Sequence, residues 1–208
     1  MNINRIVSSQ FGRPRGALGY LAGYIMGHRR SNLERSDWAL SLLQIEPGDR
    51  ILEIGFGPGV AVGKAAAKAA EVVGIDRSVL MVSQATRRNK ELIESGKLKL
   101  LHGSAETLSP ELGLFDKIYS VNVAQLWKEP VAVFHRLGDL LKPGGVLLTA
   151  HMPRNAGATD EDAVQKGKQI ENWLREAGFR QMRTQTRTMK PVAVVAVLAS
   201  MSQAFTLD

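Results

Sequence analysis

The sequence has no cysteine, and this absence excludes several kinds of chemistry at once. Without thiolates the chain has no cysteine nucleophile, no disulfide, no zinc–thiolate site and no iron–sulfur cluster. Histidine is scarce too, with four residues in the chain. If a reaction here needs a histidine as general base, it must be one of His28, His102, His135 and His151.

Long hydrophobic runs are also missing. The longest early apolar run, residues 17–27, is too short to span a bilayer, which takes about 20 residues. Residues 1–10 lack the charged-then-apolar pattern of a secretory signal. With 208 residues, the chain has the size of one ordinary domain with a small appendage, and we expect a cytoplasmic globular enzyme.

Positive charge is concentrated in two segments. The net charge is +7, and residues 1–38 hold six arginines against two acidic residues. Residues 180–190 hold four basic residues and no acid, so the rest of the chain is nearly neutral. This pattern favours an anionic partner or surface near the two segments. Neither segment interleaves aromatic residues for base stacking, which argues against nucleic acid.

The stretch 51–59, ILEIGFGPG, organises the chain. A short apolar run ends in Gly55, Gly57 and Gly59, a pattern typical of a buried strand that turns sharply into a helix. The alanine-rich residues 60–70 are expected to form that helix, with its N-terminal amides facing the same spot. The turn therefore predicts a ligand site.

Strands and helices alternate through the rest of the chain. Apolar runs predict strands at 71–75, 98–101, 115–123 and 146–150, and helical patterns predict helices at 31–43, 78–88, 130–141 and 160–177. The first of these helices begins with a capping-box spacing, Ser31 and Glu34. The final runs, 179–188 and 192–199, form a hairpin. Such alternation predicts an α/β fold with a doubly wound, mostly parallel sheet and an antiparallel final strand.

The N-terminal part is expected to differ from the rest. Residues 17–27 have helical periodicity with a glycine at every fourth position, Gly19, Gly23 and Gly27. Glycines destabilise a helix, so we expect a packing or functional reason, such as a hinged lid over a ligand. The chain is accordingly divided into an N-terminal arm and helical lid, residues 1–36, and a main domain, residues 37–208.

Residues after the turn narrow the class of ligand that it is expected to bind. Asp76 follows the second strand, where an acid suits ribose hydroxyls. The glycine spacing differs from the dinucleotide fingerprint, because position 60 is Val, and no Gly-Lys-Ser/Thr follows to make a phosphate-binding P-loop.

At this point the sequence resembles the class I S-adenosylmethionine-dependent methyltransferases, over about residues 37–199. The resemblance implies a Rossmann-like seven-stranded sheet, a transferase activity, the cofactor S-adenosyl-L-methionine and the product S-adenosyl-L-homocysteine. It extends to the small-molecule and phospholipid N-methyltransferase-like members. Five motifs carry it in the expected order: residues 52–59, 73–76, 103–106, 115–122 and 141–145.

The resemblance also implies roles for individual residues. The methionine end of the cofactor would lie against the glycine turn and Glu53, the ribose against Asp76, and the adenine beside Arg77, Met81 and the third motif. The family often has Asp or Asn where Ser104 stands, so Glu106 is an alternative for the adenine amino contact. The cofactor-binding set implied is Glu53, Gly55, Phe56, Gly57, Gly59, Asp76, Arg77, Met81, Ser104, Ala105, Glu106, Asn122 and Gln125.

Residues for the methyl acceptor are harder to assign. A base would help remove a proton from a phenol, acid or amine, and we favour His151, directly after the fifth strand, and then His28. His135 is expected to face the sheet from a helix and to be structural. Substrate contacts are expected from Tyr20, Tyr24 and Trp127, and no metal site is expected.

Several acceptors are argued against. Residues 120–123, SVNV, replace the motif used for exocyclic base amines, and the missing cysteine excludes cytosine C5 and thiolate-dependent arsenic methylation. The leading interpretation is O- or N-methylation of a small organic molecule, driven by proximity. The alternative is a phospholipid N-methyltransferase held peripherally at an anionic membrane by its basic segments. A nucleic-acid-binding protein that kept the fold is the hypothesis from another class.

Overall fold

The computed structural model describes residues 29–202, so the calls on Tyr20, Tyr24, His28 and the 17–27 helix lie outside the described residues. Within this part a seven-stranded sheet has the order β3-β2-β1-β4-β5-β7-β6. Its strands are β1 (Arg50–Ile54), β2 (Glu71–Asp76), β3 (Leu98–His102), β4 (Phe115–Val121), β5 (Leu141–His151), β6 (Gln181–Arg187) and β7 (Val194–Ser200).

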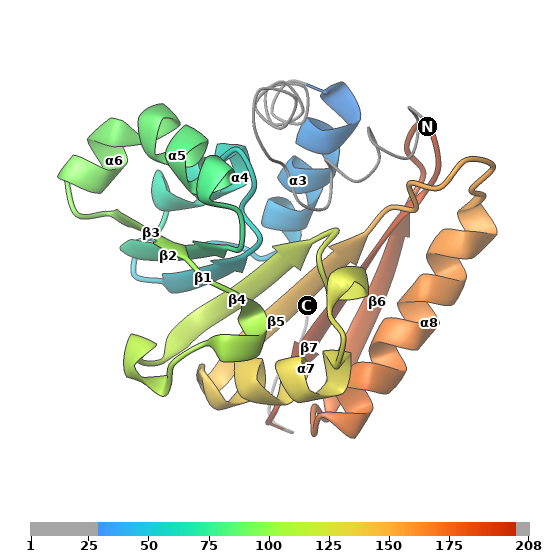
Figure 1. Cartoon of the computed structure of the whole chain (residues 1–208). Coiled ribbons are helices and arrows are strands. Elements are labelled where there is room, and N and C mark those ends of the chain that lie inside the picture. Colours follow the sequence, from blue (N-terminus) through green and yellow to red (C-terminus); the bar gives the residue numbers. More distant parts are fainter. Residues whose placement is uncertain (1–28, 203–208) are drawn as a thin grey trace.

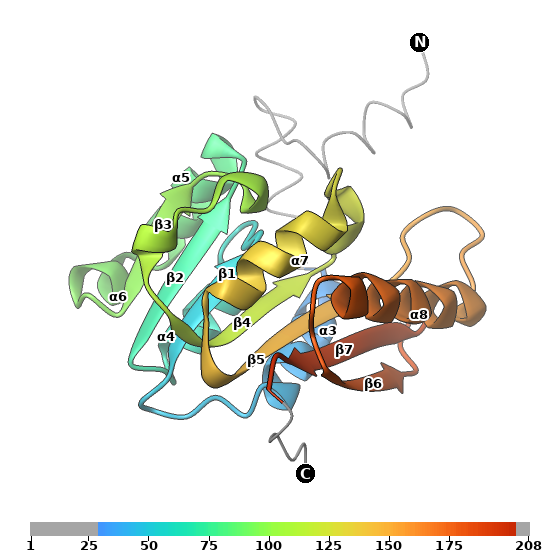
Figure 2. The ribbon, with the colours of Figure 1, turned by 90° about the horizontal axis from the view of Figure 1, so that it is seen from below.

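Helices cover both faces of the sheet (Figure 1). Figure 2 shows α7 and α8 in front of the sheet, with α3 behind it. The helices are α3 (Arg30–Leu42), α4 (Val60–Ala66), α5 (Val79–Arg88), α6 (Lys90–Glu94), α7 (Pro130–Asp139) and α8 (Asp160–Glu176). Three short 3-10 turns are η1 (Ala105–Thr107), η2 (Pro110–Leu112) and η3 (Ala124–Leu126).

The strand directions confirm the expected topology. β1 pairs in parallel with β2 and with β4, while β7 runs antiparallel to both β5 and β6. The chain moves from β1 outward to β3 and then returns to the other side of β1 as β4. This reversal creates a crevice at the carboxyl ends of β1 and β4, the place where doubly wound sheets bind ligands.

Two hydrophobic cores hold the layers together. Successive side chains of a strand point to opposite faces, so Ile51 packs in the core that includes α3 and α4, and Leu52 packs in the core that includes α7 and α8. Both are fully buried. Both faces of β1 are covered, and after Arg50 at its start the strand is apolar except for Glu53. Glu53 points to the same face as Ile51.

The start of α3 differs from the sequence prediction. The helix begins at Arg30 with Arg29 at its N-cap position and no side-chain cap, so the capping box expected from Ser31 and Glu34 is wrong. Glu34 instead accepts a hydrogen bond from Arg30 Nε at 2.6 Å, one turn earlier on the same helix face. The boundary expected between residues 36 and 37 falls inside this helix.

His135 also differs from its prediction. Its side chain is 66% exposed on α7 rather than turned to the sheet, and its Nδ1 lies 3.3 Å from Asp139 Oδ2. The buried face of α7 is formed by Val133, Phe134 and Leu137, which leaves position 135 on the outer side.

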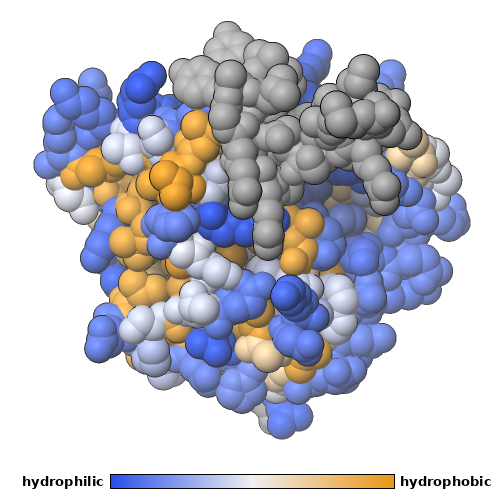
Figure 3. Space-filling view, in the orientation of Figure 1, coloured by the Kyte–Doolittle hydropathy of each residue, from blue (hydrophilic) through white to orange (hydrophobic). Residues whose placement is uncertain are grey.

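The surface is mainly hydrophilic on the face shown in Figure 3, most uniformly over α8. Among residues 29–202 no helix has the length and hydrophobicity needed to cross a membrane.

Gly59 provides a test of the packing behind the glycine turn. It has φ +82°, and a Cβ there would lie 2.5 Å from Ala85 Cβ of α5. Gly96 has a similar φ of +76°, with nothing within 4 Å of its would-be Cβ. We expect Gly96→Ala to cost only the left-handed backbone strain, about 1–2 kcal/mol.

Gly59→Ala should cost about 1–3 kcal/mol more, from overpacking against α5. Urea unfolding of both variants measures the difference. Equal losses of stability would contradict the close approach of α4 and α5.

Candidate functional site

A cavity of about 500 Å³ lies at the carboxyl ends of β1, β2 and β4, the crevice identified from the topology. Its walls come from the loops that follow these strands and from the first turns of α3. The following residues of the expected cofactor and substrate sets line it: Glu53, Gly55, Phe56, Gly57, Asp76, Arg77, Met81, Ser104, Ala105, Glu106, Asn122, Gln125 and Trp127. Gly59 is not among the lining residues, because it packs against Ala85 and Asn89 of the neighbouring helices.

The glycine turn is tight on one side and open on the other. Gly55 has φ +75°, and a Cβ there would lie 2.5 Å from Val123 Cγ2, so the β1 loop and the β4 loop touch. Gly57 has φ +55°, and nothing described lies within 4 Å of a Cβ built on it. The backbone at Gly57 is therefore exposed to the cavity, where a ligand can approach it closely.

Asp76 joins the loops after β1 and β2. Its Oδ2 accepts a hydrogen bond from the Gly57 amide at 2.8 Å, and its Oδ1 accepts one from the Ser78 amide at 2.9 Å. Burial raises the pKa of this carboxyl, while the hydrogen bonds from Ser78 and Gly57 act in the opposite direction. Each oxygen keeps a further lone pair for a ligand hydroxyl.

Glu53 is a buried carboxyl at the floor of the cavity. Burial raises its pKa to about 8, and the nearby Asp76 adds to this, whereas a hydrogen bond from Tyr119 opposes it. The Tyr119 hydroxyl donates to Glu53 Oε2 at 2.5 Å across the β1–β4 pair. A positive charge in the cavity would favour the ionised form of Glu53.

The ends of β4 and β5 are joined through Asn122. This residue has φ +56°, and its side chain accepts from Met152 N and donates to Met152 O, both at 2.8 Å. Gln125 Nε2 donates to Asn122 O at 2.8 Å. A non-glycine residue in this backbone region is strained and is held in place by such contacts. Gln125 is thereby fixed at the cavity wall.

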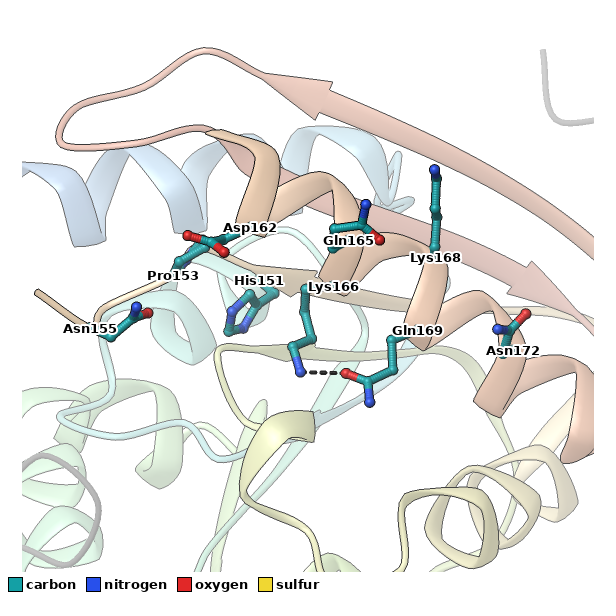
Figure 4. Close-up of a pocket in the computed structure, with 9 residues that line it drawn as sticks. All are labelled: His151, Pro153, Asn155, Asp162, Gln165, Lys166, Lys168, Gln169 and Asn172. Carbon is teal, nitrogen blue, oxygen red and sulfur yellow. Dashed lines mark hydrogen bonds between the residues drawn. The ribbon is translucent and has the colours of Figure 1, made fainter. Parts of the chain in front are cut away.

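His151 lines a second cavity, of about 670 Å³, between the β5 end and α8. Figure 4 shows its ring close to Lys166, whose ammonium reaches Gln169. His151 of this second cavity contacts Gln125 of the first, since its Nδ1 lies 3.3 Å from Gln125 Oε1. Burial lowers the pKa of His151 to about 4, and Lys166, Arg35 and Arg154 add to this. The ring is therefore neutral near pH 7.

Sequence reasoning predicted Arg77 but missed three other arginines of the first cavity. Arg29, Arg35 and Arg154 line it together with Asn32. Arg35 had a recognisable signal, because it lies one turn before Trp38 on the buried face of α3, where a charge is unusual. Arg154 lies beyond β5 in a loop and had no such signal.

Among residues 29–202 no group of three or more potential metal ligands is close enough to hold an ion.

Comparison with known proteins places the chain. Residues 51–145 match the family described as a methyltransferase domain. An uncharacterized methyltransferase of Bacillus subtilis, YdaC, is 33% identical over 181 residues, which cover 86% of this chain and 97% of that protein. The chain belongs to the class I S-adenosylmethionine-dependent methyltransferases.

One further relative of this methyltransferase is named for a small-molecule substrate. The erythromycin 3''-O-methyltransferase of Saccharopolyspora erythraea is 27% identical over 185 residues, covering 78% of this chain and 60% of that protein. The fold is shared with the N-methyltransferase NodS of Bradyrhizobium japonicum, solved with S-adenosylhomocysteine, at a TM-score of 0.68 and 17% identity. That match covers 84% of this methyltransferase and 89% of NodS.

The raised pKa of Glu53 predicts how the stability of the methyltransferase depends on pH. A carboxyl that stays protonated to about pH 8 when folded, but ionises near its ordinary value when unfolded, contributes stability below that ordinary value. This contribution is lost as the pH rises towards 8. We expect Glu53→Gln, which cannot ionise, to gain stability relative to the wild type by about 1 kcal/mol or more between pH 5 and 8.

Urea unfolding at several pH values measures this difference. Glu94→Gln, on the exposed side of α6, is the matched control and should show no such trend. A difference between wild type and Glu53→Gln that stays constant with pH would contradict the raised pKa.

Proposed function

We propose that the protein transfers the methyl group of S-adenosylmethionine to an oxygen or nitrogen atom of a small organic molecule. We further propose that the cofactor binds in the cavity at the carboxyl ends of β1, β2 and β4. The observation that carries this proposal is the meeting, in one cavity, of the glycine turn, Glu53 and Asp76. These are the groups that the family resemblance assigns to the methionine and ribose parts.

The residues present fit such a ligand. The cavity volume of about 500 Å³ lies within the usual range for small-molecule sites, about 300–1,000 Å³. Asp76 offers acceptor oxygens for a ribose diol, and Glu53 offers a buried carboxyl for a cationic amino acid end. Met81 and Ala105 give an apolar wall suited to a planar base. The proposed contact of the adenine amino group is Glu106, whose carboxylate accepts a hydrogen bond from Ser104.

The cofactor supplies a methyl group on a positively charged sulfur, ready for displacement by an acceptor atom in line with the carbon–sulfur bond. The protein has to align the acceptor and exclude water. Asn122 and Gln125 fix the wall beside β4, as described above. Trp127, directly after η3, lines the cavity. Its ring makes an edge-to-face contact with the Phe134 ring, with the ring centroids 5.1 Å apart. Alignment of the acceptor and exclusion of water both favour methyl transfer driven by proximity.

His151 remains the proposed histidine of the reaction, and its surroundings indicate a positioning role. Gln125 Oε1 can only accept, so His151 Nδ1 must carry a hydrogen and donate it. Three cations nearby disfavour a second proton on the ring. We therefore propose that His151 holds Gln125 in place, and that the acceptor releases its proton to water or to a group of its own.

The phospholipid alternative remains a second proposal. It is supported by the edge strand β6, where Arg183 and Arg187 are exposed beside the exposed Lys190. Flotation with anionic liposomes tests it, and binding that depends on residues 1–28 would support it.

Asp76 provides the direct test of the cofactor site. Asp76→Asn keeps one acceptor oxygen but loses the negative charge and one backbone hydrogen bond. A hydrogen bond to a charged group contributes about 1.5–3 kcal/mol, so S-adenosylhomocysteine should bind about tenfold to a hundredfold more weakly.

Isothermal titration calorimetry measures this affinity. Asp139→Asn, which changes an exposed aspartate on α7, should leave it unchanged. Unchanged affinity in Asp76→Asn would refute the assignment of the ribose contact.

The His151 ring offers a test by NMR. Its pKa is expected near 4, far below the ordinary histidine value, so its resonances should stay constant between pH 6 and 8. His151→Gln assigns the signals. A His151 pKa of 6.5 or above would restore its role as a general base.

A further inference from the structure

Three arginines occupy one wall of the proposed cofactor cavity. Arg29 and Arg35 belong to the start of α3, and Arg154 belongs to the loop after β5. Asn32 brings two of them together, because its Oδ1 accepts from Arg35 Nη2 at 3.4 Å and from Arg154 Nη2. The uncharged side chain of Asn32 therefore brings the positive guanidinium groups of Arg35 and Arg154 close together.

Arg35 is almost completely buried, with 6% of its surface exposed. Its Nη1 lies 3.8 Å from Met152 Sδ, a weak acceptor, and its Nε has no hydrogen-bond partner among the described residues. Burial, together with the charges of Arg154 and Arg29, lowers the pKa of Arg35 to about 9. Burying a guanidinium with an unused donor is costly, and an anion would offset that cost.

No described carboxylate forms an ion pair with any of the three arginines. Residues 1–28 contain neither aspartate nor glutamate, and Asp208 is the one acidic side chain of residues 203–208. Of the acidic residues that line the cavity, Glu53 lies in β1, Asp76 ends β2 and Glu106 follows β3. This side of the cavity is therefore mainly acidic, with Arg77 next to Asp76, while the side formed by α3 and Arg154 is basic.

The cofactor alone does not account for the basic wall. S-adenosylmethionine carries a sulfonium, an ammonium and one carboxylate, so its net charge is positive. That charge complements the acidic wall, and its one carboxylate is already offset by its own ammonium. Arg29 and Arg154 are exposed to water, but the buried Arg35 lacks a negative partner, and another ligand would supply it.

We propose that the methyl acceptor carries a compact anionic group, a phosphate or a carboxylate, which Arg35 and Arg154 hold beside Asn32 and Met152. This inference rests on the proposed function, because it names the class of the second substrate. Guanidinium forks suit both oxyanions, since they can donate two parallel hydrogen bonds. Arg29, at the start of α3, adds charge at the same wall.

The position of the arginines agrees with this assignment. Arg35 contacts the Met152 side chain, and the Asn122 side chain is hydrogen-bonded to the Met152 backbone. Asn122 and Gln125 line the same cavity, and the family resemblance implies that they lie beside the sulfonium. Lys166, across His151 in the second cavity, extends the positive field along the β5 end. An anion bound to the arginines would therefore place the rest of the acceptor near the methyl group.

The test is binding of inorganic phosphate and of benzoate to the enzyme saturated with S-adenosylhomocysteine, at constant ionic strength. Titration calorimetry follows the wild type, Arg154→Gln at the exposed rim and Arg35→Lys in the buried position. We expect saturable binding of at least one anion to the wild type, weakened at least tenfold in each variant. Affinity for S-adenosylhomocysteine should stay within twofold. Arg87→Gln, an arginine on α5 outside the cavity, is the matched control.

The proposal would be overturned if the loaded wild type bound no anion, or if all variants bound the anion equally. It would also be overturned if phosphate competed with S-adenosylhomocysteine and the arginine variants lost affinity for the cofactor. The last would mean that the arginines hold the cofactor carboxylate. Failure of the wild type to bind S-adenosylhomocysteine at all would instead contradict the proposed function. Thermal unfolding of each variant shows that it is folded.

A second arm distinguishes the source of the anion. The loaded enzyme is titrated with phosphoethanolamine, with ethanolamine and with phosphatidylethanolamine vesicles. Binding of the soluble phosphate ester indicates a free small molecule, and binding of the vesicles alone indicates a lipid headgroup. Either result supports the anionic subsite, provided that Arg154→Gln weakens it. Equal binding of ethanolamine and phosphoethanolamine would contradict it.

Discussion

The carboxylate of Asp76 is the constraint on which the proposed cofactor cavity depends. It accepts one backbone amide from the loop after β1 and one from the loop after β2, so it fixes the distance between two loops that no strand pairing reaches. The glycine turn can be open to a ligand because this contact holds it from the side. A carboxylate in this position serves structure and recognition together, since its remaining lone pairs face the cavity.

Charge is separated across the cavity, and this separation follows from the topology. The acidic residues lie at the ends of β1 and β2 and after β3, while Arg29, Arg35 and Arg154 lie at α3 and beyond β5, on the other side of the crevice. A buried acid with a raised pKa and a buried arginine with a lowered pKa are both unfavourable without a ligand of opposite charge. A cationic cofactor and an anionic acceptor would relieve both. The two inferences about the ligands therefore have one electrostatic origin.

The sequence was sufficient for the sheet and the antiparallel final strand, because these depend on local patterns. Most of the expected cofactor residues line one cavity, and their contacts with the cofactor stay a prediction. Glycines at positive φ, an acid after a strand and apolar runs all have signals within a few residues. Two predictions failed: Glu34 pairs with Arg30 instead of forming the capping box, and His135 faces solvent. Gly59 packs against α5 and does not line the cavity, so its contact with the cofactor stays a prediction. Arg154 reaches Asn32 from 122 residues away, and no local pattern could reveal that contact.

The central claim is that S-adenosylmethionine binds at the carboxyl ends of β1, β2 and β4. A crystal structure of the protein with S-adenosylhomocysteine tests it most directly. The account predicts ribose hydroxyls at the Asp76 carboxylate and the homocysteine end between Glu53 and the backbone of Gly55 and Gly57. A nucleoside bound in the α8 cavity, or ribose hydroxyls that make no contact with Asp76, would contradict it.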